Sequence, residues 1–236
     1  MTDLAAIAED RRFMDQGTAC FLEQVGRLDS TSLLESSPLP GWTRGHIVTH
    51  VARNADGVTR LLGWARTGVE DPMYGDRHPR NEDIAAGAGR PLGDQVADLR
   101  QACRRLDAAL DAMPDAAWSA TISAATRQIS AGYLPWMRAR EVWLHALDLD
   151  LGATYRDLPP EFARRFLGEV IQDLSGRPGM PALELHTQDG TLTVAGEGAP
   201  VPLEGTAAAL LCRLTGRPGE VSVAGGGELP ALPDWL

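Results

Sequence analysis

The sequence contains no lysine, and acidic side chains outnumber basic ones by 32 to 22. All 22 basic residues are therefore arginines, and the formal net charge at pH 7 is −10. A chain without a basic surface field does not attract nucleic acid or anionic membranes. We therefore expect neither as a partner, and the charge itself indicates no particular substrate.

Cysteine is also scarce, with Cys20, Cys103 and Cys212 far apart and no CxxC pair among them. An odd and sparse set predicts a reducing cytosol and no disulfide framework, and each thiol is expected to fill a small apolar space in the core. The sequence has no run of about 18 apolar residues, which a membrane span requires. Its charged start also lacks the apolar stretch of a signal peptide, so we expect a cytoplasmic protein.

The 236 residues are enough for one large domain or for a medium and a small one, and they contain no internal repeat. Apolar residues recur at helical spacing in four segments of the first part of the chain. These segments are residues 3–28, 43–66, 92–113 and 134–151. We therefore predict a four-helix bundle over residues 1–152.

The pattern changes after Gly152. Helical spacing returns in two segments, and apolar residues alternate with polar ones in others, as in a hairpin. The expected elements are helices at 160–174 and 206–214 and strands at 182–187, 191–194 and 220–223. Residues 153–236 are therefore predicted to form a small α+β domain.

A long polar loop, residues 69–93, is expected between the second and third helices because the segment contains three prolines and several glycines. Loops of this length are usually functional or disordered. The strings Met73-Tyr74 and Arg80-Asn81-Glu82 indicate that this one is ordered against another part of the protein.

A carboxylate and an imidazole lie four residues apart in the fourth predicted helix, at Glu141 and His145. Residues at this spacing share one face of a helix. The helix is apolar almost all round and is expected to be buried, so its carboxylate must be paired or bound to a metal. The spacing leaves two interpretations open: a metal site, or an ion pair of Glu141 with Arg138 beside a core His145.

The second predicted helix repeats polar side chains every four residues, at His46, His50 and Asn54. Helix bundles build metal sites from inward-facing side chains on facing helices, so either histidine could supply a third ligand. Spacing alone does not choose between them, and His46 could instead be a first-turn residue satisfied by local backbone or solvent. Two histidines and one carboxylate, with a fourth position open, are the ligands of a catalytic zinc site.

Arg80 lies in the predicted loop. Its guanidinium could hold a substrate carboxylate through two parallel hydrogen bonds, which lysine does not form. The alternative is a solvated arginine that pairs with Glu82 or Asp83. His78 and His186 belong to no recognisable pattern of partners, and we predict no function for them.

Several strings of residues carry a family resemblance, densely in residues 41–87 and 136–149 and sparsely after residue 152. They are Gly41-Trp42-Thr43-Arg44 with His46 and His50, Trp64-Ala65, Pro72-Met73-Tyr74, Arg80-Asn81-Glu82, Trp136-Met137-Arg138, and Arg140-Glu141-Val142-Trp143 with His145-Ala146. In these strings the chain resembles the mycothiol-dependent maleylpyruvate isomerases, within the DinB-like zinc-dependent thiol-transferase family.

This resemblance implies a DinB-like four-helix bundle followed by a small domain similar to sterol-carrier-like modules. It assigns the family's zinc ligands to His50, Glu141 and His145, with His46 not among them, and the family's functional arginine to Arg80. It also implies Zn²⁺ and mycothiol as cofactors and maleylpyruvate as substrate. The oligomeric state and the residues that contact the thiol stay open.

The implied reaction converts maleylpyruvate to fumarylpyruvate, a cis–trans change about a carbon–carbon double bond. A thiolate that adds to the alkene makes that bond single, so it can rotate before the thiolate leaves. A bound metal keeps the thiol deprotonated. Arg80 is expected to orient a carboxylate and stabilise the developing enolate, and Asp148 and Asn54 are expected to orient the ligand rings.

Three other functions remain open on the sequence. A mycothiol S-transferase, for detoxification or a natural-product pathway, would use the same thiolate but leave it attached to its electrophile. A metal hydrolase would activate water and need no thiol. A zinc-stabilised binding module would need a closed set of four ligands, and the sequence offers three with no cysteine near them.

Overall fold

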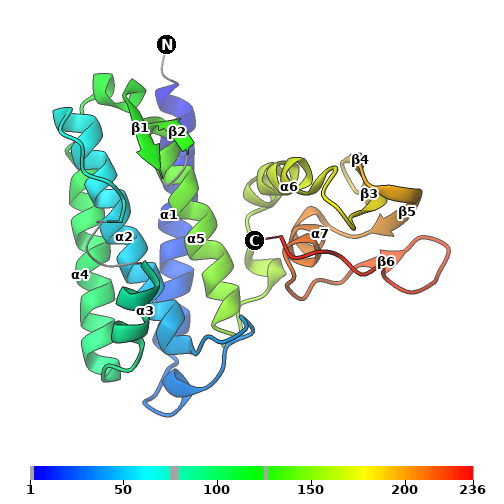
Figure 1. The fold of residues 1–236 in the computed structure, drawn as a ribbon, viewed down its shortest axis with the longest axis horizontal. Helices are drawn as coiled ribbons and strands as arrows, with labels where there is room; N and C mark the ends of the chain where they lie inside the picture. The colour runs from blue at the N-terminus through cyan, green and yellow to red at the C-terminus, as the bar shows by residue number, and fades with distance from the viewer. Residues whose placement is uncertain (1–2, 75–79, 125–126, 236) are drawn as a thin grey trace. The chain divides into compact units, whose positions relative to one another are not determined.

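The structure is a computed structural model that describes residues 3–74, 80–124 and 127–235. The chain divides into two compact units, Met1–Gly152 and Ala153–Leu236. The first unit is helical with one small hairpin, and the second combines helices with a four-stranded sheet (Figure 1). Within the described ranges, no helix has the length and apolar character that crossing a membrane requires.

Four long helices run side by side in the first unit (Figure 1). They are α1 (Leu4–Val25), α2 (Arg44–Thr67), α4 (Leu92–Asp111) and α5 (Leu134–Asp148). α1 packs against α5, α5 against α2, and α2 against α4. Each lies within a few residues of a helix predicted from apolar spacing, because each buries an apolar stripe against its neighbours.

Shorter elements connect these helices: η1 (Ser32–Leu34), α3 (Arg80–Ala88), η2 (Asp115–Ser119), β1 (Thr121–Ala124), β2 (Arg127–Ser130) and η3 (Ala131–Tyr133). β1 and β2 form an antiparallel hairpin that the sequence did not predict. The prediction of a continuous loop over residues 69–93 is wrong, because α3 lies within it. An acidic first turn and several alanines favour a helix there, and the buried Ile84 and Ala88 stabilise it as α3 packs on α2.

Two buried arginines tie α2 to α5. Arg44, at the start of α2, donates from Nε to the carbonyl of Leu149 directly after α5, at 2.7 Å. Arg138, on α5, is fully buried and donates from Nη1 to the carbonyl of Val51 at 2.9 Å and to Oδ1 of Asn54 at 2.8 Å. The two helices are therefore held together at two points along their contact.

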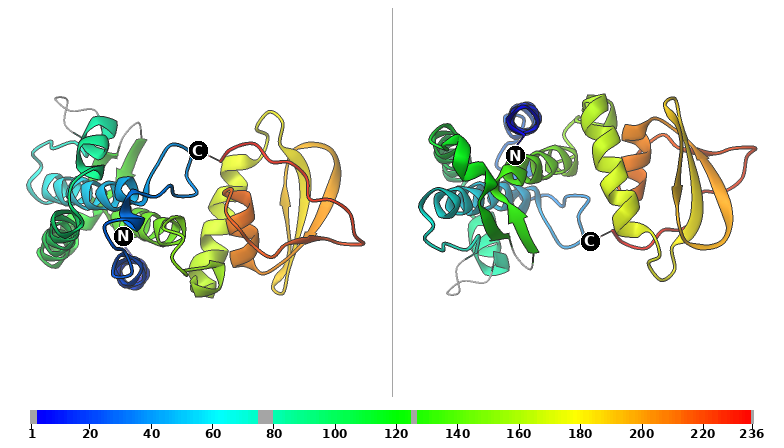
Figure 2. Two further views of the ribbon diagram at one scale, coloured as in Figure 1. Left: turned by 90° about the horizontal axis from the view of Figure 1, so that it is seen from below. Right: turned by 90° about the horizontal axis from the view of Figure 1, so that it is seen from above.

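In the second unit, α6 (Pro160–Leu174) and α7 (Ala207–Leu214) lie on one face of the sheet (Figure 2). The remaining elements are η4 (Tyr155–Asp157), β3 (Pro181–Thr187), β4 (Gly190–Val194), β5 (Glu197–Glu204) and β6 (Ser222–Val223). The strand order is β4-β3-β5-β6, in which β3 and β5 are parallel and the other pairs are antiparallel. Buried apolar side chains from both layers form the core, among them Phe162, Phe166, Leu183, Leu185 and Leu210.

Strand β5 is not predicted from the sequence because it contains Pro200 and Pro202, and proline cannot donate to a sheet ladder. The carbonyl of Pro202 accepts from Ala224 on the side away from β3. The nitrogen and carbonyl of one strand residue point to the same side, so the proline nitrogens face the outer edge. The ladder to β3 therefore loses no donor.

Gly17 on α1 provides the clearance for α5, since a Cβ at this position would lie 2.7 Å from Val142 Cγ2 and 2.8 Å from Trp143 Cδ1. We expect Gly17→Ala to lower the free energy of unfolding by about 1–3 kcal/mol through overpacking. Gly63→Ala on α2 is the matched control, because an added Cβ there has no neighbour within 4 Å. It should raise the free energy of unfolding by about 0.5–1 kcal/mol. Urea denaturation measures both variants, and equal effects would contradict close packing at Gly17.

Candidate metal centre

Helices α2 and α5 bring three predicted site residues together. His50 lies in α2, and Glu141 and His145 lie one turn apart on α5. His50 Nε2 lies 2.9 Å, and His145 Nε2 3.4 Å, from the same carboxylate oxygen, Glu141 Oε2. One ligand atom from each residue lies within 4.8 Å of the others. Two imidazole nitrogens and a carboxylate oxygen that converge in this way fit a divalent metal ion.

Asp148 orients one of the two imidazoles. Its Oδ2 lies 2.9 Å from Nδ1 of His145, and the residue is only 1% exposed, so Nε2 of that ring is directed at Glu141. The same expectation is wrong for Asn54, whose Oδ1 accepts from Arg138 instead of orienting a ring. Arg138 donates its hydrogen bonds to α2, and Glu141 is bonded to the two imidazoles. The arrangement therefore differs from the Glu141–Arg138 ion pair that the sequence left open as an alternative.

His46 lies outside this cluster of three side chains. Its Nδ1 accepts from the backbone N–H of Thr43 at 3.1 Å and lies 2.8 Å from the hydroxyl of the same residue. The ring therefore caps the N-terminus of α2, which is the local role that the sequence left open for it.

Trp42 covers the cluster, and the sequence reasoning assigned it no role. Its ring centroid lies 5.5 Å from that of His50 and 6.5 Å from that of His145. The half-buried indole forms an apolar wall beside the donor atoms. The sequence signals are its place in the string Gly41-Trp42-Thr43-Arg44 and its position one residue before the N-cap of α2, at the helix end nearest His50.

The three side chains differ in their preference for protons. Burial disfavours the charged form of Glu141, but hydrogen bonds from His145 and His50 hold its pKa well below the ordinary value. Burial likewise disfavours protonated His145, yet hydrogen bonds to Asp148 and Glu141 raise its pKa. Burial lowers the pKa of His50 to about 4, against the hydrogen bond to Glu141. His50 is therefore neutral and ready to bind a metal at neutral pH, whereas protons compete for His145.

Arg80 begins α3 and reaches the cluster. Its Nη2 lies 3.2 Å from Nδ1 of His50. Its guanidinium carbon lies 5.9 Å from the ring centroid of Tyr74, a residue that the sequence reasoning also left without a role. A half-buried cation is thus held beside the three donor side chains, where it can pair with an anionic group of a bound molecule.

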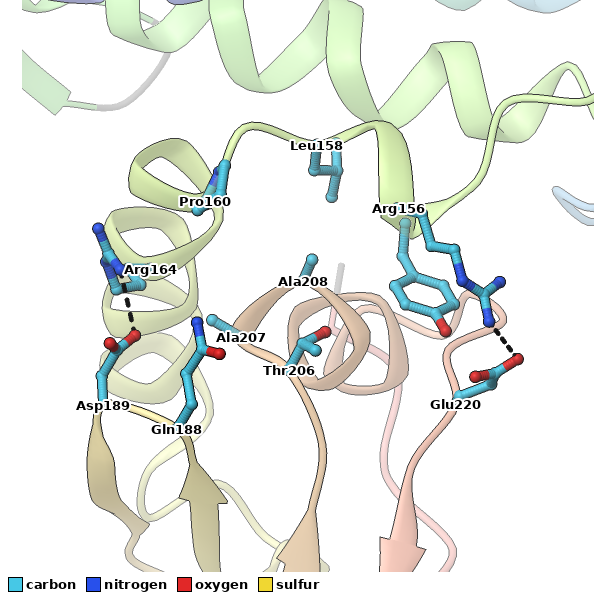
Figure 3. A pocket seen from close by; sticks show the side chains of 11 residues that line it. Arg156, Leu158, Pro160, Arg164, Gln188, Asp189, Thr206, Ala207, Ala208 and Glu220 are labelled. Atoms are coloured by element: carbon cyan, nitrogen blue, oxygen red, sulfur yellow. Dashed lines mark hydrogen bonds and ion pairs between the residues drawn. The ribbon is translucent and has the colours of Figure 1, made fainter.

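The other sites considered do not add donors. His78 lies outside the described residues, and His186 lies on β3 of the second unit. That unit has a concavity of about 410 Å³, with an Arg164–Asp189 ion pair (3.2 Å) on one side and a second arginine–glutamate pair on the other (Figure 3). No histidine or cysteine is among its described lining residues, so it lacks the donors of the cluster on α2 and α5.

In the metal-free protein, we expect the pKa values of the two histidines of the cluster to lie on opposite sides of the ordinary value of 6.5. As the pH falls, His145 should gain its proton above pH 6.5, and His50 should stay neutral until about pH 4. NMR titration of the imidazole resonances measures both, with His50→Gln and His145→Gln to assign the signals. Two ordinary titrations near 6.5 would contradict the described hydrogen bonds.

The chain resembles known proteins along its whole length. Residues 14–150 match the family model described as the mycothiol maleylpyruvate isomerase N-terminal domain. Two solved structures, of a mycothiol-dependent maleylpyruvate isomerase and of a histidine-to-alanine mutant of it, each match with 32% identity, a TM-score of 0.90 and 100% of both chains covered. No match is found among curated proteins. Because the family model spans more than half of the sequence, this chain belongs to the mycothiol maleylpyruvate isomerase family.

Proposed function

We propose that this protein is a zinc- and mycothiol-dependent maleylpyruvate isomerase that produces fumarylpyruvate. The observation that carries the proposal is the convergence of His50, Glu141 and His145 with the Arg80 guanidinium beside them. The full-length likeness to a solved mycothiol-dependent maleylpyruvate isomerase supports the same reaction here. A diacid substrate suits a site in which a cation lies next to the metal donors.

We infer that His50, Glu141 and His145 bind Zn²⁺ and leave a fourth position open, because zinc accepts two imidazoles and a carboxylate in catalytic sites. When bound, the zinc would hold the mycothiol sulfur as a thiolate, the nucleophile that adds to the alkene and later leaves it. Asp148 would keep the His145 ring in its binding orientation.

Arg80 would bind one carboxylate of the substrate. A guanidinium offers two parallel donors that match a carboxylate and fix its direction. Its charge would also stabilise the negative charge that moves toward the substrate ketone during the reaction. The half-buried position strengthens this effect, because less water screens the interaction.

We also propose that α1, α2, α4 and α5 form a DinB-like four-helix bundle domain that ends at residue 152. The second domain would be similar to sterol-carrier-like modules. A cytoplasmic location is part of the proposal, and the burial of Cys103 and Cys212 agrees with the small apolar role expected of them.

The deciding experiment follows the absorbance of maleylpyruvate with purified protein, with and without mycothiol, alongside zinc analysis. Thiol-dependent conversion to fumarylpyruvate with about one zinc per chain would support the proposal. Zinc without conversion would favour a mycothiol S-transferase acting on another electrophile. Consumption of maleylpyruvate in thiol-free buffer would favour a hydrolase in which the metal activates water.

His50→Ala should lose both metal and activity, because it removes one of three ligands. We expect its zinc content to fall from about one per chain to near zero and thiol-dependent turnover to vanish. His186→Ala, on β3, is the matched control and should keep both. Metal analysis and the absorbance assay measure the pair. Normal turnover by a zinc-free His50→Ala protein would rule out the metal mechanism.

Arg80→Ala should keep its zinc and lose activity, since Arg80 is expected to contact substrate rather than metal. We expect turnover to fall on the order of 10²-fold, as when one preorganised charge-stabilising donor is removed. Arg100→Ala, an exposed position on α4, is the control and should behave like the wild type. If Arg80→Ala lost its zinc as well, the arginine would have a structural role at the cluster.

A further inference from the structure

The chain that follows α2 is anchored at Met73, which is 7% exposed. Gly57 of α2 makes room for this side chain, since a Cβ at Gly57 would lie 2.6 Å from Met73 Cγ. Arg60 of the same helix donates from Nη2 to the Met73 carbonyl at 2.8 Å. A side-chain contact and a backbone hydrogen bond therefore hold the residue immediately before Tyr74 against α2.

Tyr74 is half-buried, and its ring lies beside the Arg80 guanidinium, whose central carbon is 5.9 Å from the ring centroid. Burial raises the pKa of the phenol, and the Arg80 charge opposes this increase. Glu141 is close enough to add to the increase. The phenol therefore keeps its proton at neutral pH and offers a hydrogen-bond donor beside the Arg80 guanidinium.

We propose that Tyr74 is a further catalytic residue, whose phenol donates a hydrogen bond to the ketone oxygen of the substrate while Arg80 holds a substrate carboxylate. The division of roles follows from donor geometry, because a guanidinium matches the two oxygens of a carboxylate and a phenol matches one oxygen. This inference rests on the proposed isomerase function.

The electrons of the reaction move to and from that oxygen. As the thiolate sulfur bonds to an alkene carbon, the π bond breaks and its electron pair moves through the conjugated system to the ketone oxygen. After rotation the pair returns, the alkene re-forms and the carbon–sulfur bond breaks. Tyr74 keeps its proton throughout, and its hydrogen bond strengthens as the oxygen becomes negative. A fixed donor of this kind acts on the transition state more than on the bound substrate.

The test compares Tyr74→Phe with Tyr133→Phe in zinc-loaded protein with mycothiol and maleylpyruvate. Tyr133 is a matched control because it is also half-buried in the first unit, with an arginine, Arg140, 5.8 Å from its ring centroid. We expect kcat of Tyr74→Phe to fall on the order of 10²-fold with little change in KM, since a transition-state interaction is lost. Zinc content and the thermal midpoint should stay at wild-type values, as should kcat of Tyr133→Phe.

A wild-type kcat in Tyr74→Phe would overturn the inference. Loss of zinc, or a lowered thermal midpoint, would assign the hydroxyl to structure and overturn it as well. These outcomes differ from failure of the proposed function. If Tyr74→Phe has a wild-type kcat while the wild-type protein converts maleylpyruvate and Arg80→Ala is slow, only the role of Tyr74 is rejected. An inactive wild-type protein would reject both proposals together.

Discussion

The three candidate metal donors come from two different helices, so the site depends on the fixed separation of α2 and α5. Arg44 bonds across this contact beyond His145, and Arg138 bonds across it one turn before Glu141. A buried guanidinium is unfavourable unless its N–H groups are bonded. Each arginine obtains part of its hydrogen bonding from the opposite helix, and Arg44 also bonds Glu35 and Ser32. Helix packing and donor alignment form one cooperative unit, which holds the donors within the narrow limits that binding requires.

The two imidazoles of the cluster have neighbours of opposite charge. Behind His145 lies the buried carboxylate of Asp148, and beside His50 lies the guanidinium of Arg80. Glu141 joins the two halves through a single oxygen shared between the rings. One side of the cluster is therefore backed by an acid and the other by a cation, so an anionic molecule is attracted to the Arg80 side.

Patterns within a single helix were predictable from the sequence, and contacts between segments were not. The long helices and the Glu141–His145 pair follow from spacing alone. His46 and His50 share one face of α2, so spacing does not separate their roles; in the structure His46 bonds the N-cap and His50 bonds Glu141. Helix α3 was not predicted because the prolines and glycines around it are typical of a loop. Arg80 reaches the cluster because α3 packs against α2, and Tyr74 lies beside Arg80 while Met73 is held against α2. Local periodicity does not encode such packing.

The prolines of β5 also affect how the edge of the sheet can pair with other molecules. A sheet edge that presents unpaired N–H and C=O groups is a template on which a strand of another molecule can add. In the described part of the chain, β6 pairs with Leu203 and Glu204, and Ala224 bonds to the Pro202 carbonyl, so the residues of β5 before Pro202 are left at such an edge. Pro200 presents no N–H there. This part of the β5 edge is therefore a poorer template for the addition of a strand from another molecule.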